Sequence, residues 1–132
     1  MPFNTVTKPV RSLMNQVVTV KGRFFPDTTN NPSATYNIGR GWSVVRSDVG
    51  KFTVTFVDVG VKVLNMKANL QLPVGTLADI DVKCCEIDLS AKTLVLQCYL
   101  TSDGTTAKEP TAYNASQSIS FEVDFINSTV DY

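Results

Sequence analysis

The chain has 132 residues and contains no histidine. Histidine is the usual general base at neutral pH and the partner of nucleophilic serine and cysteine, so the sequence excludes these catalytic groups. Cysteine is also scarce, and the three cysteines are Cys84, Cys85 and Cys98. An odd number gives no complete disulfide framework, and three cysteines without histidine are too few for a zinc site. We therefore expect buried thiols that act as small hydrophobic side chains.

The sequence also lacks net charge and long apolar runs. Twelve basic and twelve acidic residues cancel, so the chain gains no long-range attraction to nucleic acid or to an anionic membrane. No window is long and apolar enough to span a bilayer. Residues 1–13 contain no apolar core of a signal peptide. We expect a protein that is made in the cytoplasm and has neither nucleic-acid nor membrane partners.

What the sequence has in abundance is alternation of apolar and polar residues. In residues 119–125, and again in residues 52–56, every second residue is apolar. A period of two is typical of a strand with one face in a core and the other in water. The pattern recurs along the chain and predicts strands at residues 16–25, 41–46, 51–57, 61–72, 77–87, 92–101 and 118–127.

The spacing of these segments predicts the fold. We expect an all-β, antiparallel β-sandwich or jelly-roll-like domain of about seven or eight strands over residues 16–132. Pro2 and Pro9 restrict residues 1–15, which we interpret as an extended N-terminal arm. A short strand within residues 35–38 and a helical turn at residues 63–67 are weaker alternatives.

Three local features refine the prediction. Gly50 ends the turn at residues 47–50 and is free to adopt positive φ. In the hairpin of residues 77–87 and 92–101, Cys84 lies opposite residues 95–96 and Cys98 opposite residues 81–82, so the two thiols do not face each other. A bulge at residues 63–64 would place five apolar residues on one face, namely Leu64, Met66, Ala68, Leu70 and Leu72.

Polar residues offer few sites for chemistry. Asp79 and Asp81 are two residues apart on one strand face, which we interpret as a solvated face and not as an acid–base pair. Residues 27–31 contain a single carboxylate, which favours an ordinary turn over a calcium site. We therefore expect no catalytic residue, no metal ligand and no cofactor.

Two long loops, at residues 26–41 and 102–117, are candidate contact surfaces. Tyr36, Arg40 and Trp42 interleave aromatic rings with a cation, a pattern that can stack against sugars or bases. In the alternative interpretation, Trp42 points inward and anchors the core while Arg40 lies at the rim. Tyr113 is the corresponding aromatic candidate in the second loop.

Three segments carry a resemblance to a known group of proteins. They are GWSVVRSDVGKFTVTF, ADIDVKCCEIDLSAKTLVLQCYL and SISFEVDFINSTV, and with their connections they span residues 41–130. Their layout resembles that of small β-sandwich virion proteins of tailed bacteriophages, of the head decoration (cement) or fibre type. The likeness lies in strand patterns and not in a catalytic signature.

The resemblance implies a non-enzymatic virion protein. As a capsid decoration protein it would stabilise the head by contacts with the major capsid protein or other virion proteins, as a homotrimer. Lys8 and Arg11 of the arm would pair with capsid carboxylates, and three apolar arm residues would fill shallow grooves, namely Phe3, Val6 and Val10. Alternatively, the arm covers an edge strand of its own sandwich, or the chain is a head- or tail-fibre module that binds a host receptor or glycan.

Overall fold

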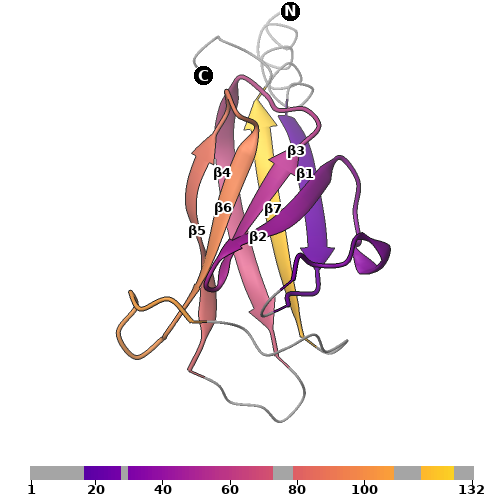
Figure 1. Ribbon diagram of the computed structural model, residues 1–132. Helices are drawn as coiled ribbons and strands as arrows, with labels where there is room; N and C mark the ends of the chain where they lie inside the picture. The colour runs from indigo at the N-terminus through magenta and orange to yellow at the C-terminus, as the bar shows by residue number, and fades with distance from the viewer. Residues whose placement is uncertain (1–16, 28–29, 73–78, 109–116, 127–132) are drawn as a thin grey trace, which may run out of the picture.

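The computed structural model describes residues 17–27, 30–72, 79–108 and 117–126. These residues form two antiparallel sheets, one with the strand order β1-β7-β4 and the other β2-β3-β6-β5 (Figure 1). The strands are β1 (Val17–Phe24), β2 (Trp42–Asp48), β3 (Lys51–Phe56), β4 (Lys62–Gln71), β5 (Asp81–Asp88), β6 (Thr93–Tyr99) and β7 (Ser118–Ile126). The predicted all-β, antiparallel sandwich is confirmed. The predicted arm, residues 1–15, lies outside the described residues.

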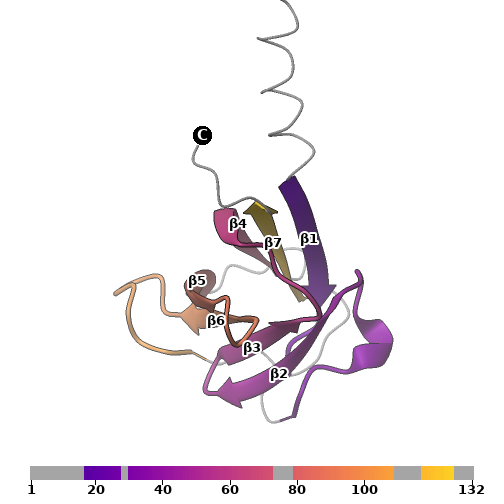
Figure 2. The same cartoon turned by 90° about the horizontal axis from the view of Figure 1, so that it is seen from above.

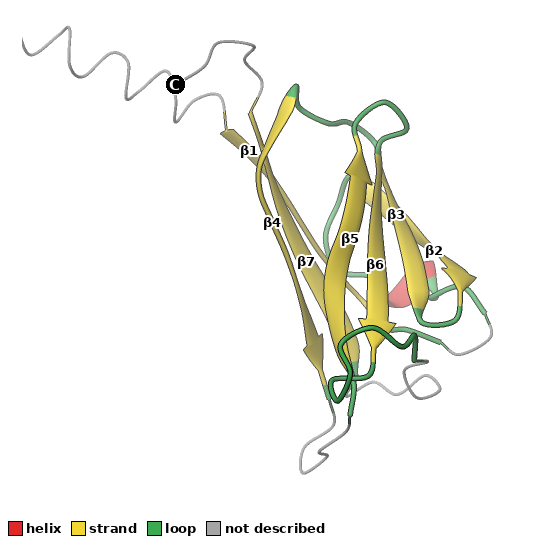
Figure 3. Cartoon of the chain, turned by 90° about the vertical axis from the view of Figure 1, so that its left-hand side faces the viewer, coloured by secondary structure: helices red, strands yellow, loops and turns green. Residues whose placement is uncertain are grey.

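The two sheets face each other as two layers (Figures 2 and 3). Sheet β2-β3-β6-β5 consists of two hairpins side by side, and β4 contacts β5 where the sheets adjoin. The core between the sheets comes from alternate residues of the strands, as the period of two predicts. The fully buried side chains include Phe24, Phe52, Phe56, Leu94, Leu96, Ile119, Val123 and Phe125.

Aromatic rings join the two layers. The Phe24 and Phe52 rings lie 5.3 Å apart between centroids, and Phe56 meets Phe125 edge-on at 5.5 Å. Each pair has one ring from either sheet. Tilted and edge-on aromatic pairs contribute stability beyond the area they bury. These contacts therefore hold the sheets against each other.

The two hairpins and the bulge follow the predicted registers. Cys84 pairs with Leu96 and Val82 with Cys98, and Gly50 has a φ of 59°. A register shift occurs in β4 between Val63 and Asn65, which confirms the predicted bulge. The inward position predicted for Leu64 is wrong, since this residue is 57% exposed. As the extra residue of the bulge, Leu64 has no partner on β7 and leaves the inner face to Met66 and its successors.

The expected burial of the thiols is right for one cysteine and wrong for another. Cys98 is buried, Cys84 is half-buried, and Cys85 is exposed. Successive side chains of a strand point to opposite faces, so the inward position of Cys84 turns Cys85 toward solvent. A register shift between Cys84 and Glu86 leaves Cys85 without a partner on β6.

The segment between β1 and β2 differs from the predicted short strand. Residues Ala34–Tyr36 form a 3₁₀ turn, and Ile38 alone pairs with the edge of β1. The backbone N–H of Ile38 donates to the carbonyl of Arg23, and the N–H of Arg23 donates back, both at 2.9 Å. The helical alternative at residues 63–67 is also wrong, because these residues belong to β4.

The absence of a side chain at Gly22 leaves space for the Trp42 ring. The Trp42 ring packs edge-on against Phe121, with centroids 4.9 Å apart, and lies 6.3 Å from the Phe24 centroid. A Cβ atom at Gly22 would overlap the six-membered part of the Trp42 ring and the tip of Phe121. Glycine in β1 therefore makes room for the tryptophan that joins β2 to the other sheet.

We predict that Gly22→Ala lowers the free energy of unfolding by about 1–3 kcal/mol, because the added methyl group overpacks this contact. Urea denaturation measures the change. In a Trp42→Leu background the same substitution should cost less, since one of the two rings that it meets is gone. An equal loss in the free energy of unfolding in both backgrounds would show that the Trp42 ring does not limit the space at Gly22.

Thiol labelling should separate the three cysteines. Cys85 is exposed, whereas burial raises the pKa of the half-buried Cys84 thiol and so lowers its thiolate fraction. We expect one fast-reacting thiol in the native protein and three in denaturant, measured with a chromogenic disulfide reagent. Cys85→Ser should remove the fast phase. If the fast phase persisted in that variant, our assignment of the exposed thiol would be incorrect.

Candidate functional site: a polar hollow and an apolar end

The outer face of sheet β1-β7-β4 is arranged in rows of polar side chains. Strand registers place Lys21 and Lys67 on either side of Glu122, and Arg23 and Asn69 on either side of Ser120. The inner face of the same strands carries the core, so period-two alternation assigns these side chains to the solvent side. Three strands thus contribute to one polar surface.

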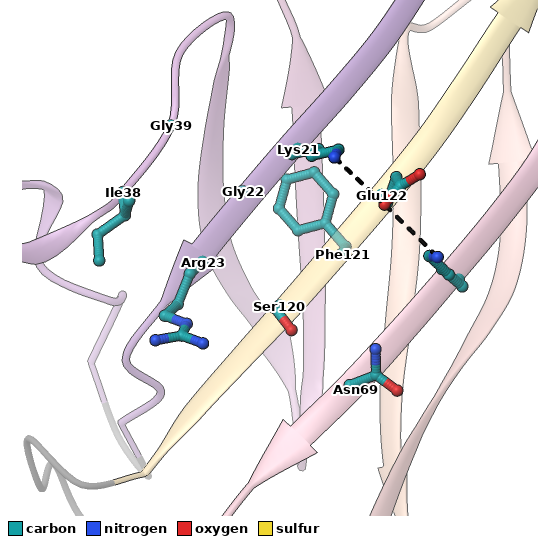
Figure 4. A pocket seen from close by; sticks show the side chains of 10 residues that line it. Lys21, Gly22, Arg23, Ile38, Gly39, Asn69, Ser120, Phe121 and Glu122 are labelled. Carbon is teal, nitrogen blue, oxygen red and sulfur yellow. Dashed lines mark ion pairs between the residues drawn. The ribbon is translucent and has the colours of Figure 1, made fainter.

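A hollow of about 300 Å³ lies on this surface. Figure 4 shows its lining, which comes from β1, β7, β4 and the segment that follows the 3₁₀ turn. The lining residues are Lys21, Gly22, Arg23, Ile38, Gly39, Lys67, Asn69, Ser120, Phe121 and Glu122. This size is at the lower end of the range for small-molecule sites.

Cations outnumber carboxylates in the hollow. Glu122 lies 3.9 Å from the ammonium of Lys21 and 3.6 Å from that of Lys67, so one carboxylate is shared by two lysines (Figure 4). Arg23 has no carboxylate partner among the described residues. The local charge is therefore positive, although the chain as a whole is neutral.

Backbone contacts build one wall of the hollow. The Arg23–Ile38 bridge ties the loop to β1, and Gly39, at a φ of 110°, follows directly. A Cβ atom at Gly39 would overlap the carbonyl oxygen of Lys21. Glycine is therefore required for this close approach, which brings the exposed side chain of Ile38 to the rim.

Apolar side chains gather at one end of the sandwich. This apolar end consists of Val18, Val57, Val61 and Leu64, and each side chain is at least 45% exposed. They lie where β1 and β4 begin and β3 and β7 end, at the top of Figure 1. A second hollow of about 130 Å³ opens there between β1 and residues 58–60. Gathered apolar residues on a surface are typical of a contact with another protein.

The predicted loop residues do not form one surface. Tyr36 is 51% exposed and Arg40 is exposed as well, whereas Trp42 packs against Phe24 and Phe121. The alternative interpretation of Trp42 as an inward anchor therefore describes its position. Tyr113 and the arm residues lie outside the described residues, and those are Phe3, Val6, Lys8, Val10 and Arg11.

Asp79 has a structural role. Its carboxylate accepts hydrogen bonds from the hydroxyl of Thr101 and from the backbone N–H and hydroxyl of Ser102. These bonds hold the pKa of Asp79 below its ordinary value. A carboxylate with a lowered pKa is a poor general base at neutral pH. Asp79 precedes β5, so its predicted place on a strand face with Asp81 is wrong, and its donors tie the segment before β5 to the turn after β6.

Asp103 stabilises the same turn. It accepts from the Thr106 hydroxyl and from the backbone N–H groups of Thr106 and Thr105, which lower its pKa to about 2. The described part of the chain contains no group of three or more metal-ligating side chains. Nor does it contain a helix with the length and apolarity needed to cross a bilayer.

The predictions from the sequence did not include the residues of the polar hollow. Lys21, Arg23 and Lys67 are separated along the chain, and no motif connects them. Their only signal is that each occupies a polar position in an alternating segment. Finding the cluster requires the pairing of β1 and β4 on either side of β7.

Comparisons with protein families, curated proteins and solved structures found no match for this chain.

The pH dependence of the free energy of unfolding should show how much Asp79 and Asp103 stabilise the fold. Folding lowers both carboxyl pKa values, so the ionised groups stabilise the fold above about pH 4, and this stabilisation is lost as pH falls toward 2. We expect Asp79→Asn/Asp103→Asn to be less stable than the wild type at about pH 5 and to lose less stability on acidification.

Urea denaturation at several pH values measures both effects. Asp81→Asn is the control, because it removes a neighbouring carboxylate but none of the bonds to residues 101–106. A double variant with the same acid sensitivity as the wild type would show that these contacts do not contribute.

Proposed function

We propose that this chain is a non-enzymatic virion structural protein, specifically a bacteriophage capsid decoration protein that stabilises the head by protein–protein contacts. The proposal includes assembly as a homotrimer on the major capsid protein and a final location in the virion. A rigid antiparallel sandwich suits this role, because it presents fixed surfaces without needing to change shape.

The apolar end is the observation that carries the proposal. Val57 is 74% exposed and Leu64 is 57% exposed, and with Val18 and Val61 they form a cluster at one end of the domain. Complete burial of an exposed valine or leucine side chain contributes about 1.5–3 kcal/mol, and these side chains, which are partly exposed, would contribute a fraction of that in a contact. An apolar cluster at one end of a neutral domain therefore supports docking onto another protein.

The first described strand starts at the same end. β1 begins at Val17, beside the apolar end, so the predicted arm of residues 1–15 would be attached next to it. Val6 and Val10 would extend the apolar contact, and Lys8 and Arg11 would pair with carboxylates of the capsid. The arm and the apolar end together would form one docking surface.

A head- or tail-fibre module that binds a host receptor is the second candidate. The polar hollow on the outer face of sheet β1-β7-β4 favours it, because the hollow faces away from the core and lies apart from the apolar end. The exposed side chains of Tyr36 and Arg40 would lie on the loop side of such a surface.

Binding to purified capsids tests the decoration role. Wild-type protein should co-sediment with capsids that lack it, and Val57→Asp/Leu64→Asp should bind about tenfold more weakly or worse, since charge opposes apolar burial. Val49→Asp is the matched control, because Val49 is 45% exposed in the β2–β3 turn, away from the apolar end.

Two outcomes would contradict the proposal. One is absence of the protein from purified virions by mass spectrometry. The other is equal capsid binding by the double variant and the wild type, provided that both give the same unfolding curve. Light scattering tests the trimer separately, and a monomer at all concentrations would remove that part of the proposal.

A further inference from the structure

We infer that the polar hollow binds an anionic sugar, that is, a saccharide carrying a carboxylate or sulfate group. This inference goes beyond the assembly role and does not depend on it. It assigns a ligand chemistry to residues of β1, β7 and β4, namely Lys21, Arg23, Lys67, Asn69 and Ser120.

The charge of the hollow selects an anion. Arg23 faces the hollow without a carboxylate partner among the described residues, and Lys21 and Lys67 share Glu122. A ligand carboxylate or sulfate near Ser120 would lie between β1 and β4, within the reach of cations from both strands. Hydrogen bonds between ionised partners are stronger than those between neutral groups, so the anion would orient the ligand.

The neutral residues select a sugar. Within the described residues, neither Ser120 nor Asn69 has a side-chain hydrogen bond, so a hydroxyl and an amide are free to bind ring hydroxyls. Ile38, 57% exposed at the wall, offers an apolar contact to the face of a sugar ring. A hollow of about 300 Å³ has room for a small ligand of this kind.

The surrounding rows argue against a nucleic-acid strand. The next row toward the apolar end carries Asp124, whose carboxylate accepts a hydrogen bond from Thr19 at 2.6 Å. On the other side, the row of Ser118 and Gln71 has no charge. A phosphate backbone binds along an extended track of cations. Here the cations of the hollow occupy two adjacent rows, and Lys62, the next cation on β4, is separated from them by the row of Asp124. This arrangement fits a single anionic group better than an extended strand.

The test is binding of the full chain to a panel of sialylated, uronic-acid and sulfated oligosaccharides, each paired with its neutral counterpart. We expect a preference for the acidic member of at least one pair, with affinity that falls as salt is raised. Arg23→Ala/Lys67→Ala should weaken this binding about tenfold, because two charge-assisted contacts are lost.

Two further variants separate binding from a merely structural effect. Glu122→Gln should tighten binding by about two- to fivefold, since it removes a carboxylate that repels the anion. Lys83→Ala, which removes an exposed cation from β5 of the other sheet, should leave binding unchanged. Thermal unfolding of each variant checks that the fold is retained.

Four results would overturn the inference. The first is no binding to any acidic sugar, and the second is equal binding to acidic and neutral members of every pair. The third is binding of inorganic sulfate as tight as that of the sugar, which would indicate an adventitious ion only. The fourth is equal competition by single-stranded DNA. None of them involves Val57 or Leu64, so the decoration proposal stands or falls on its own test.

Discussion

The pairing register of β7 is the constraint on which the other features depend. This strand lies between β1 and β4, and its alternate side chains serve two different purposes. Phe121, Val123 and Phe125 fill the core, while Ser120 and Glu122 form the centre of the polar hollow. A slip of one residue would exchange the two faces and would expose aromatic rings to water. Core burial therefore determines the position of the surface residues as well.

The bulge in β4 extends this constraint across the sheet. After the extra residue Leu64, Met66 pairs with Val123 and Lys67 with Glu122. Without the bulge, residues 65, 67 and 69 would point inward and the apolar residues of β4 would face solvent. One inserted residue therefore completes the inner face, brings Lys67 and Asn69 to the hollow and leaves Leu64 at the apolar end. The polar hollow and the apolar end therefore both depend on this bulge.

The two surfaces differ in physical character, which allows them separate roles. The apolar end is formed by side chains that water solvates poorly, close to Val17 at the start of β1. The polar hollow is formed by charged and hydrogen-bonding groups on a solvated sheet face. The first is suited to lasting contact with another protein and the second to a small anionic ligand. A neutral chain without histidine thus presents two surfaces of opposite chemistry.

Alternation along single segments, with the turn residues between them, was enough to predict the all-β class, both hairpins, the position of Cys84 opposite residues 95–96 and the bulge near Val63. These are local features, because burial of one strand face imposes a period of two on each segment separately. The tertiary structure alone decided the outward position of Leu64, the inward packing of Trp42 under Gly22 and the meeting of Lys21, Arg23 and Lys67 around β7. Such contacts join residues that are distant in the chain, and only the order of strands within each sheet determines which of them become neighbours.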